Sequence, residues 1–186
     1  MPRLVVLASG SGTTLQAMLD DPDLRPQIVA AGTDVPHCPA MTRAADAGVP
    51  TFAHRLRDYR DRAAWSSALA DSIASYQPDL VVLAGFMKLL APEIVHRFRI
   101  VNTHPALSPA FPGAHAIRDA LAAGASTTGV TVHWVDEGVD TGPVIAQAAV
   151  GVEPGDDEDS LRARVQAAEK PLYVETIKKL TVEDFA

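Results

Sequence analysis

The chain has 186 residues, of which 47% are hydrophobic and 21% are charged, and its formal net charge is −7. This length fits one domain with a buried core, and the charged fraction is typical of folded rather than disordered chains. The 16 Lys and Arg form no block and are outnumbered by 23 Asp and Glu. The composition therefore argues against non-specific binding to nucleic acid or to a membrane surface, and leaves room for an anionic small molecule.

Cys38 is the single cysteine, so no disulfide can form within the chain. The apolar run at residues 4–8 is too short for the core of a secretory signal, and Gly and Ser follow it closely. No apolar run approaches the ~18 residues that cross a membrane. We therefore expect a cytoplasmic protein that is not inserted in a membrane.

The first half of the sequence alternates between segments typical of strands and segments typical of helices. Strands rich in Val, Leu, Ile and Ala, with a weaker pattern at the third, are expected at 3–8, 27–32, 49–53 and 79–85. Helices are expected at 15–21, 39–48, 58–76 and 91–98. In the longest of these, Trp65, Leu69 and Ile73 recur at four-residue steps and form one apolar face.

The second half continues the alternation, with strands expected at 99–102, 128–135 and 143–152 and helices at 116–124 and 157–180. Pro171 is expected to kink the last helix or split it in two, because proline has no backbone N–H to donate. Alternating strands and helices with short links predict an α/β fold, with a doubly wound, mainly parallel twisted sheet and helices on both faces. No flexible linker occurs, so residues 1–186 are expected to form a single domain.

The stretch SGSGTTLQ, residues 9–16, joins the first strand to the first helix. The N–H groups and dipole at a helix start attract anions, and Gly10 and Gly12 allow close approach to the backbone. The turn has Leu15 in place of the third glycine of a dinucleotide fingerprint, and it lacks the lysine of a P-loop. Asp34 stands where a ribose-binding acid would lie. We expect a monophosphate site, with a ligand-free turn and a nicotinamide site as alternatives.

Asn102 and His104 follow the apolar strand that begins at residue 99. Residues two apart in an extended chain point to the same side, so the two side chains converge if the strand continues through Thr103. Pro105 restricts His104 to an extended conformation. An amide and an imidazole at the C-terminal end of a strand, where open α/β sheets bind ligands, can both donate to a developing oxyanion. The Asn-x-His pattern alone fits a structural histidine equally well.

The stretch VDEGVDTGPV, residues 135–144, offers a partner for this pair, because it is a loop in which Asp140 lies between Gly138 and Gly142. An aspartate folded back against the histidine would favour its protonated form and accept a proton. In most such loops the carboxylates are solvated instead. Metal and covalent chemistry are poorly supported, since no paired cysteines or HExxH motif occur and nothing marks Ser108 as an activated nucleophile.

Several stretches together resemble one family and cover nearly the whole chain. They are LASGSGTTLQA, PDLVVLAGFMKLLAP, VNTHPALSPAFPGAHAIRDAL, TGVTVHWVDEGVDTGPVIAQ and ARVQAAEKPLY. Their order and spacing are similar to those of the folate-dependent phosphoribosylglycinamide formyltransferases, and NxHP followed by DxGP at this separation is specific for folate formyl transfer. The resemblance implies that the formyl group of 10-formyltetrahydrofolate, a co-substrate, passes to the amine of glycinamide ribonucleotide in purine synthesis, without metal or covalent enzyme intermediate.

The resemblance also implies roles for individual residues. Asn102 and protonated His104 would stabilise the oxyanion of a tetrahedral intermediate, and Asp140 would keep His104 protonated and help to move the amine proton through a water. The residues implied for ribonucleotide binding are Gly12, Thr13, Thr14, Glu169 and Lys170. Those implied for folate binding are Arg62, Met87, Lys88, Leu89, Leu90, Val139 and Asp140.

Two lobes are expected within the single domain. A lobe of about residues 1–100 would bind the ribonucleotide phosphate, and a lobe of about residues 101–186 would carry the catalytic residues and much of the folate site. Thr13 and Thr14 replace the Ser and Asn that are usual in the family's phosphate turn, so that Thr14 lacks an amide donor. Ser108 stands where the family's loop usually has Leu.

Other functions fit the sequence less well. Methionyl-tRNA formyltransferase and formyltetrahydrofolate hydrolase share NxHP, but each carries a further domain for which 186 residues are expected to leave no room. Leu15 argues against an NAD-dependent oxidoreductase, and the set of Asn102, His104 and Asp140 argues against a non-enzymatic nucleotide-binding module. The expected partners are small-molecule substrates, without nucleic acid or membrane, and the protein is expected to be a monomer or a homodimer.

Overall fold

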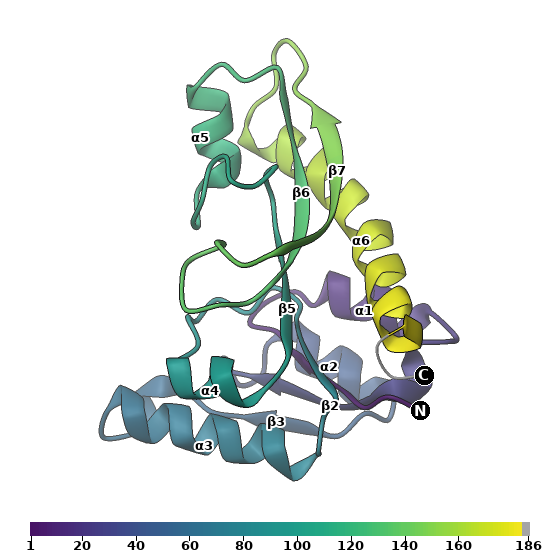
Figure 1. Cartoon of the computed structure of the whole chain (residues 1–186), viewed down its shortest axis with the longest axis vertical. Helices are drawn as coiled ribbons and strands as arrows, with labels where there is room; N and C mark the ends of the chain where they lie inside the picture. The colour runs from purple at the N-terminus through teal and green to yellow at the C-terminus, as the bar shows by residue number, and fades with distance from the viewer. Residues whose placement is uncertain (184–186) are drawn as a thin grey trace.

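The computed structural model describes residues 1–183 and contains one seven-stranded sheet in the order β3-β2-β1-β4-β5-β6-β7 (Figure 1). The strands are β1 (Leu4–Leu7), β2 (Ile28–Thr33), β3 (Thr51–Ala53), β4 (Leu80–Leu83), β5 (Ile100–His104), β6 (Thr127–Trp134) and β7 (Val144–Gly151). β1 to β5 pair in parallel, and β6 and β7 are antiparallel. The prediction of a mainly parallel α/β sheet is confirmed.

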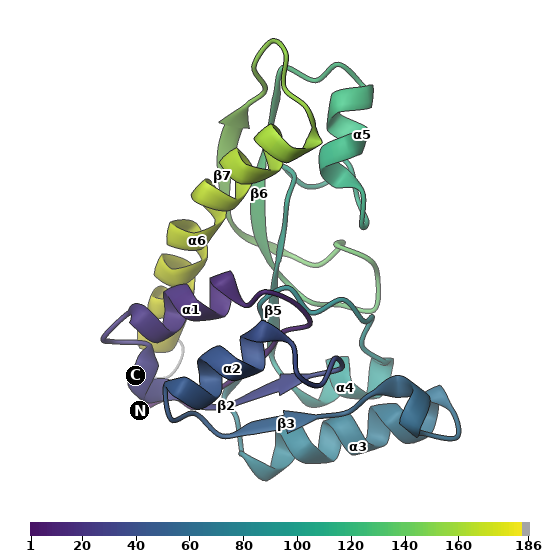
Figure 2. The same cartoon turned by 180° about the vertical axis from the view of Figure 1, so that it is seen from behind.

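Helices cover both faces of this sheet, as Figures 1 and 2 show from opposite sides. They are α1 (Thr13–Asp20), α2 (Pro39–Asp46), α3 (Arg62–Ser75), α4 (Pro92–Arg97), α5 (Ala116–Ala122) and α6 (Glu158–Glu183), with 3₁₀ turns η1 (Arg25–Gln27) and η2 (Leu56–Asp58). Helices α1, α2 and α6 pack on one face, and α3 and α4 pack on the other.

Strand β1 shows why its sequence is apolar throughout. Alternate side chains of a strand point to opposite faces. Leu4 and Val6 pack beneath α1, α2 and α6, whereas Val5 and Leu7 pack against α3 and α4. All four side chains are fully buried, so no position of the strand is available for a polar residue, and polar groups appear only after the strand ends.

The last two strands and the start of α6 form a separate part of the core. β6 and β7 are longer than β1 and β4 and extend past them, beside α5 and the first half of α6 (Figure 1). Ile117, Val130, Val150, Leu161 and Val165 form a small cluster there. This arrangement brings α6 across the carboxyl ends of the parallel strands.

Helix α6 differs from its expected form, because it runs unbroken from Glu158 to Glu183 with Pro171 inside it. Of the two outcomes predicted at Pro171, a kink or a split, the split is therefore wrong. Proline removes one backbone hydrogen bond, but packing just beyond it compensates. Tyr173 is fully buried, and its hydroxyl lies 3.0 Å from the carbonyl oxygen of Leu83 and 3.1 Å from that of Val101. These contacts hold the helix on the sheet across the proline.

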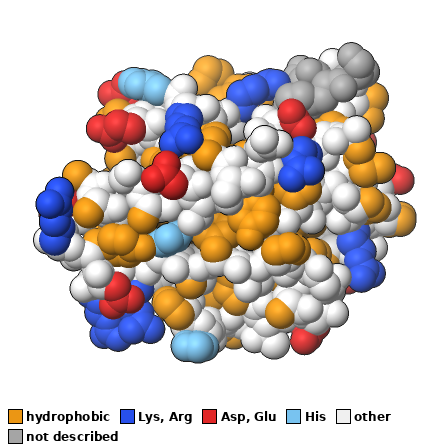
Figure 3. Space-filling model, turned by 90° about the horizontal axis from the view of Figure 1, so that it is seen from below, with side chains coloured by type: hydrophobic (Ala, Val, Ile, Leu, Met, Phe, Trp, Pro, Cys, Tyr) orange, Lys and Arg blue, Asp and Glu red, His pale blue; other side chains and the backbone are white. Residues whose placement is uncertain are grey.

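Charged side chains are dispersed over one face of the molecule. On the face shown in Figure 3, Lys and Arg side chains lie apart from one another around a central area of hydrophobic side chains. Among residues 1–183, no helix is both long and apolar enough to cross a membrane.

Candidate active site

The turn after β1 and the segment after β4 meet at the carboxyl edge of the sheet. The Ser9 N–H donates to the Gly85 carbonyl oxygen at 3.1 Å, and the Met87 N–H donates to the Ser9 hydroxyl oxygen at 2.9 Å. Ligands of open α/β sheets bind at this edge. The predicted phosphate turn and the predicted folate segment are therefore neighbours in the folded chain.

Gly12 shapes the phosphate turn and precedes α1. Its φ of 71° lies in the left-handed region, and a Cβ there would lie only 2.5 Å from the Cα of Ala40. Both the conformation and the space thus require glycine. The turn lines a cavity of about 250 Å³, whose walls also include Ala84, Gly85, Met87, Thr103, Pro105, Ile117, Arg162, Val165, Gln166 and Glu169.

Helix α6 supplies the wall opposite this turn. The Thr14 hydroxyl donates to the Glu169 carboxylate at 3.2 Å, across 155 residues of sequence. Burial raises the pKa of Glu169 and outweighs the opposing effects of Thr14 and Lys170. The structure thus brings together four of the five residues predicted for the ribonucleotide, while Lys170 is not among the residues that line the cavity.

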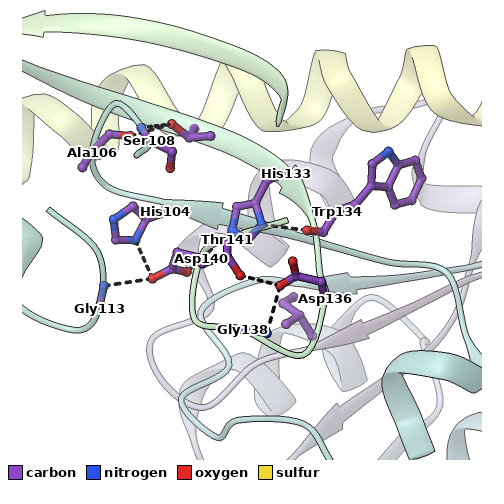
Figure 4. Close-up of polar contacts among 12 residues, drawn as sticks. His104, Ala106, Ser108, Gly113, His133, Trp134, Asp136, Gly138, Asp140 and Thr141 are labelled. Atoms are coloured by element: carbon purple, nitrogen blue, oxygen red, sulfur yellow. Dashed lines mark hydrogen bonds and ion pairs between the residues drawn. The ribbon is translucent and has the colours of Figure 1, made fainter. Parts of the chain in front are cut away.

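His104 ends β5 and is almost fully buried, with both ring nitrogens facing oxygen acceptors. Its Nε2 lies 2.8 Å from the carbonyl oxygen of Phe111, and its Nδ1 lies 3.2 Å from the Asp140 carboxylate (Figure 4). Because β5 extends to residue 104, Asn102 lies on the same side of the strand as His104.

Asp140 belongs to the loop between β6 and β7 and has a left-handed φ of 55°. Its carboxylate accepts a hydrogen bond from the Gly113 N–H at 3.0 Å, in addition to its contact with His104. The neighbouring His133 imidazole, the Gly113 N–H and the charge of His104 lower the pKa of Asp140, against the effect of burial. The carboxylate is therefore held in its charged form against the histidine that sequence analysis paired with it.

His133 is a component of this cluster that sequence analysis did not find. It lies opposite Asn102 in the β5–β6 ladder, is 3% exposed, and places its Nε2 3.6 Å from the second Asp140 oxygen. This separation is an ion-pair distance rather than a hydrogen bond. Burial lowers the pKa of His133, but Asp140 and the Trp134 carbonyl more than offset this effect, so the pKa is raised. The sequence predicted that His133 lies on a strand, but it did not give the strand register that places His133 beside Asp140.

The proline-rich segment after β5 is fixed by its backbone. The Ser108 N–H donates to the Thr131 hydroxyl oxygen at 2.9 Å, and that hydroxyl donates to the Ala106 carbonyl at 2.7 Å (Figure 4). Strand β6 therefore fixes the start of the segment that leads to Phe111, whose carbonyl contacts His104. The Ser108 hydroxyl is buried without a protein partner, and no histidine or carboxylate contact marks it as a nucleophile.

The residues predicted for the folate lie in two places. Arg62 donates to the Leu89 carbonyl at 2.5 Å, and Arg62 and Leu90 line a cavity of about 580 Å³ between α3 and α4. Met87 and Leu89 are exposed hydrophobic side chains beside this region. Val139, 44% exposed, lies on the Asp140 loop. The structure thus joins Arg62 to the segment 87–90 and leaves apolar side chains of that segment and of the Asp140 loop exposed.

Asp34 is used within the protein rather than presented as a ribose acid. Its carboxylate accepts a short hydrogen bond from the Ser9 hydroxyl and lies 3.7 Å from the Lys88 ammonium. Its side chain is only 3% exposed. Asp34 therefore links the phosphate turn to the predicted folate segment, and the feature that favoured a nicotinamide site has a structural explanation.

Comparisons with known proteins agree with this geometry. Residues 2–177 match the formyl transferase family. The chain belongs to this family. It is 50% identical over 182 residues to phosphoribosylglycinamide formyltransferase of Mycobacterium tuberculosis, covering 96% of this chain and 84% of that protein.

Solved structures of formyl transferases have the same fold. Glycinamide ribonucleotide transformylase 1 from Geobacillus kaustophilus superposes with a TM-score of 0.92 at 43% identity, covering 97% of this chain and 98% of that one. Phosphoribosylglycinamide formyltransferase from Streptococcus pneumoniae gives a TM-score of 0.90 at 40% identity, covering 97% and 99%. Among residues 1–183 of this formyl transferase, no group of three or more His, Cys, Asp or Glu is arranged to hold a metal ion.

Proposed function

We propose that this formyl transferase moves the formyl group of 10-formyltetrahydrofolate to the amino group of 5′-phosphoribosylglycinamide, in purine biosynthesis. The observation that carries the proposal is His104, held between the Asp140 carboxylate and the Phe111 carbonyl at the end of β5. The names and the similarity of its relatives support the choice of substrates.

The proposed transfer is direct. The substrate amine attacks the formyl carbon, a C–N bond forms, and the carbonyl oxygen becomes an oxyanion. Asn102 donates to this oxyanion, and His104 donates to it from Nε2 once that nitrogen leaves the Phe111 carbonyl, while Nδ1 stays on Asp140. The bond between the formyl carbon and N10 of the folate then breaks, and the proton lost by the amine is delivered to N10, with Asp140 assisting through a water.

The cavity between the turn and α6 is the proposed ribonucleotide site. Backbone N–H groups at Gly12 and Thr13 and the Thr14 hydroxyl would bind the phosphate at the start of α1. Glu169 is proposed to accept from the sugar or the glycinamide, because it already accepts from Thr14 beside the same cavity. Lys170 remains a prediction from the resemblance alone.

The folate is proposed to lie beside this cavity, against the exposed apolar side chains Leu89 and Val139 and against Met87, which also lines the cavity. Leu90 would complete this surface, and the cations Arg62 and Lys88 would approach the carboxylates of the folate. The division into an N-terminal lobe for the phosphate and a C-terminal lobe for catalysis belongs to this proposal, as do a cytoplasmic location and a monomeric or homodimeric state.

A steady-state assay with both substrates tests the function. We expect tetrahydrofolate to be released in proportion to N-formyl product. A thermal-shift series with each substrate and with NAD gives a second readout, in which the ribonucleotide raises Tm and NAD leaves it unchanged. Stabilisation by NAD together with no formyl product would overturn the proposal in favour of the nicotinamide alternative.

A further inference from the structure

The cavity beside the phosphate turn is lined by a cationic side chain, Arg162, that neither the sequence patterns nor the resemblance indicated. A phosphate monoester carries between one and two negative charges near neutral pH, and helix N–H groups alone neutralise only part of this charge. Among the described residues that line the cavity, Arg162 is the single Lys or Arg. The one acidic residue of the lining, Glu169, lies on the same helix.

Helix geometry explains why Arg162 faces the cavity and Lys170 does not. Residues three, four and seven apart share one face of an α-helix, and Arg162, Gln166 and Glu169 have these spacings in α6. All three line the cavity. Lys170 follows Glu169 and is rotated by about 100° around the helix axis, away from that face.

The guanidinium of Arg162 is available for a ligand. Its present partner is Glu158, one turn earlier on α6, and both side chains are 45% exposed. Exposed ion pairs of this kind are weak and are screened by salt. A phosphate offers the same planar fork a stronger, bidentate partner. Arg162 can therefore exchange Glu158 for a phosphate without leaving a buried charge unpaired.

Thr103 gives independent support for a polar ligand in the same cavity. It lines the cavity, and its hydroxyl oxygen is inaccessible to solvent and without a protein partner. A buried hydroxyl without a partner is unfavourable unless a ligand or water supplies one. Thr103 points to the opposite side of β5 from Asn102 and His104, so an oxygen-rich ligand in the cavity would reach the strand from the other face.

We propose that Arg162 is the cation that binds the phosphate of the ribonucleotide, from α6 and opposite the Gly12–Thr14 turn. The inference rests on the proposed function for the identity of the phosphate ester, but it concerns binding alone. It replaces Lys170, the cation implied by the resemblance, with a residue eight positions earlier on α6.

Single substitutions on α6 test this assignment. Arg162→Ala should raise the KM for the ribonucleotide by ~10-fold or more while the KM for the folate and kcat change less than about two-fold, because uniform substrate binding is lost. Arg162→Lys should recover part of the affinity, and Lys170→Ala should have the smaller effect. The matched control is Lys179→Ala, which removes the same charge and a similar i,i+4 pair, with Glu175, elsewhere on the helix.

A binding measurement separates this inference from the proposed function. Calorimetric titration with ribose 5-phosphate reports on the site without turnover. We expect the unchanged protein to bind ribose 5-phosphate and Arg162→Ala to bind it more weakly. Rising salt should weaken the binding less in the variant than in the unchanged protein. Formyl transfer with unchanged ribose 5-phosphate affinity in Arg162→Ala would overturn the role of Arg162 and leave the function standing. If Arg162→Ala binds ribose 5-phosphate more weakly but the unchanged protein transfers no formyl group, the role of Arg162 is supported and the proposed function is contradicted. A ten-fold effect of Lys170→Ala with none for Arg162→Ala would restore the original assignment.

Discussion

The phosphate turn and the catalytic cluster around His104 owe their geometry to different causes. The turn uses local backbone geometry: a left-handed Gly12, closely packed on α2, and the first N–H groups of α1. The cluster is built from four segments, the end of β5, the segment at Phe111–Gly113, His133 on β6 and the loop at Asp140. A site of the first kind can be recognised from a short motif, whereas one of the second kind depends on the assembled sheet.

The largest expected effect breaks the cluster while leaving the turn intact. Asp140→Asn should fold normally and lower kcat by ~100-fold or more, because the carboxylate that contacts His104 and assists proton transfer loses its charge. Steady-state kinetics beside a thermal melt measure this. Asp136→Asn is the matched control, since Asp136 is in the same loop and accepts from Gly138 and Thr141 without touching a histidine. Equal losses in the two variants would mean that loop structure, not the charge on His104, explains the effect.

The second prediction breaks the turn and spares the cluster. Gly12→Ala should raise the ribonucleotide KM by ~10-fold or more, because the left-handed backbone costs about 1–2 kcal/mol without glycine and the new Cβ would overlap Ala40. Gly124→Ala is the control: its φ of 63° imposes a similar strain, but nothing lies within 4 Å of the added Cβ. Kinetics and urea unfolding of both variants separate strain from overlap. A normal KM in Gly12→Ala would show that the turn does not require glycine.

The third prediction concerns pH and sharpens the description of the cluster. The pKa of His133 is raised above its ordinary 6.5, so its interaction with Asp140 is fully present below that value and is lost as pH rises through the folded pKa. The substitution His133→Asn should remove this loss of stability at alkaline pH. Melting temperatures between pH 6 and 9 should therefore converge for the two proteins as pH rises. Parallel curves would contradict the interaction. The variant should reduce kcat less than Asp140→Asn does, because His133 reaches the substrate only through Asp140.

The smallest expected effect lies in the turn. Thr14→Ala removes one hydroxyl and its hydrogen bond to Glu169, so the ribonucleotide KM should rise by about five-fold, as for one lost hydrogen bond, with kcat nearly unchanged. The hydrogen bond from Thr14 lowers the pKa of Glu169, so its loss should raise that pKa further. A titration of KM against pH detects the shift. An effect on the folate KM instead would mean that the two pockets are interchanged.

The parts of the site that the sequence predicted are those with local causes. Gly12 and the start of α1 follow from a glycine turn after an apolar strand, and the common side of Asn102 and His104 follows from their spacing in an extended chain. His133 could not be paired with Asp140, because the register of β6 against β5 is set by the whole sheet. The Phe111 carbonyl depends on a segment held by Thr131, which no motif reveals.

The same distinction applies to the fold. Strands β1 and β4 were predicted because both of their faces are buried and every residue is apolar. For α6 the sequence left a kink and a split at Pro171 both open, because the choice depends on the buried Tyr173, whose contacts with β4 and β5 keep the helix on the sheet. Asp34 follows β2, but its role depends on Ser9 and Lys88, which approach it only in the folded chain.

The central claim is direct formyl transfer from the folate to the ribonucleotide amine. The most direct measurement follows a ¹³C-labelled formyl group of 10-formyltetrahydrofolate by NMR, with mass spectrometry of the protein during turnover. We predict that the label appears in the N-formyl ribonucleotide as tetrahydrofolate is released, and that the protein mass stays unchanged. Label released as formate, or found on the protein during turnover, would contradict the account.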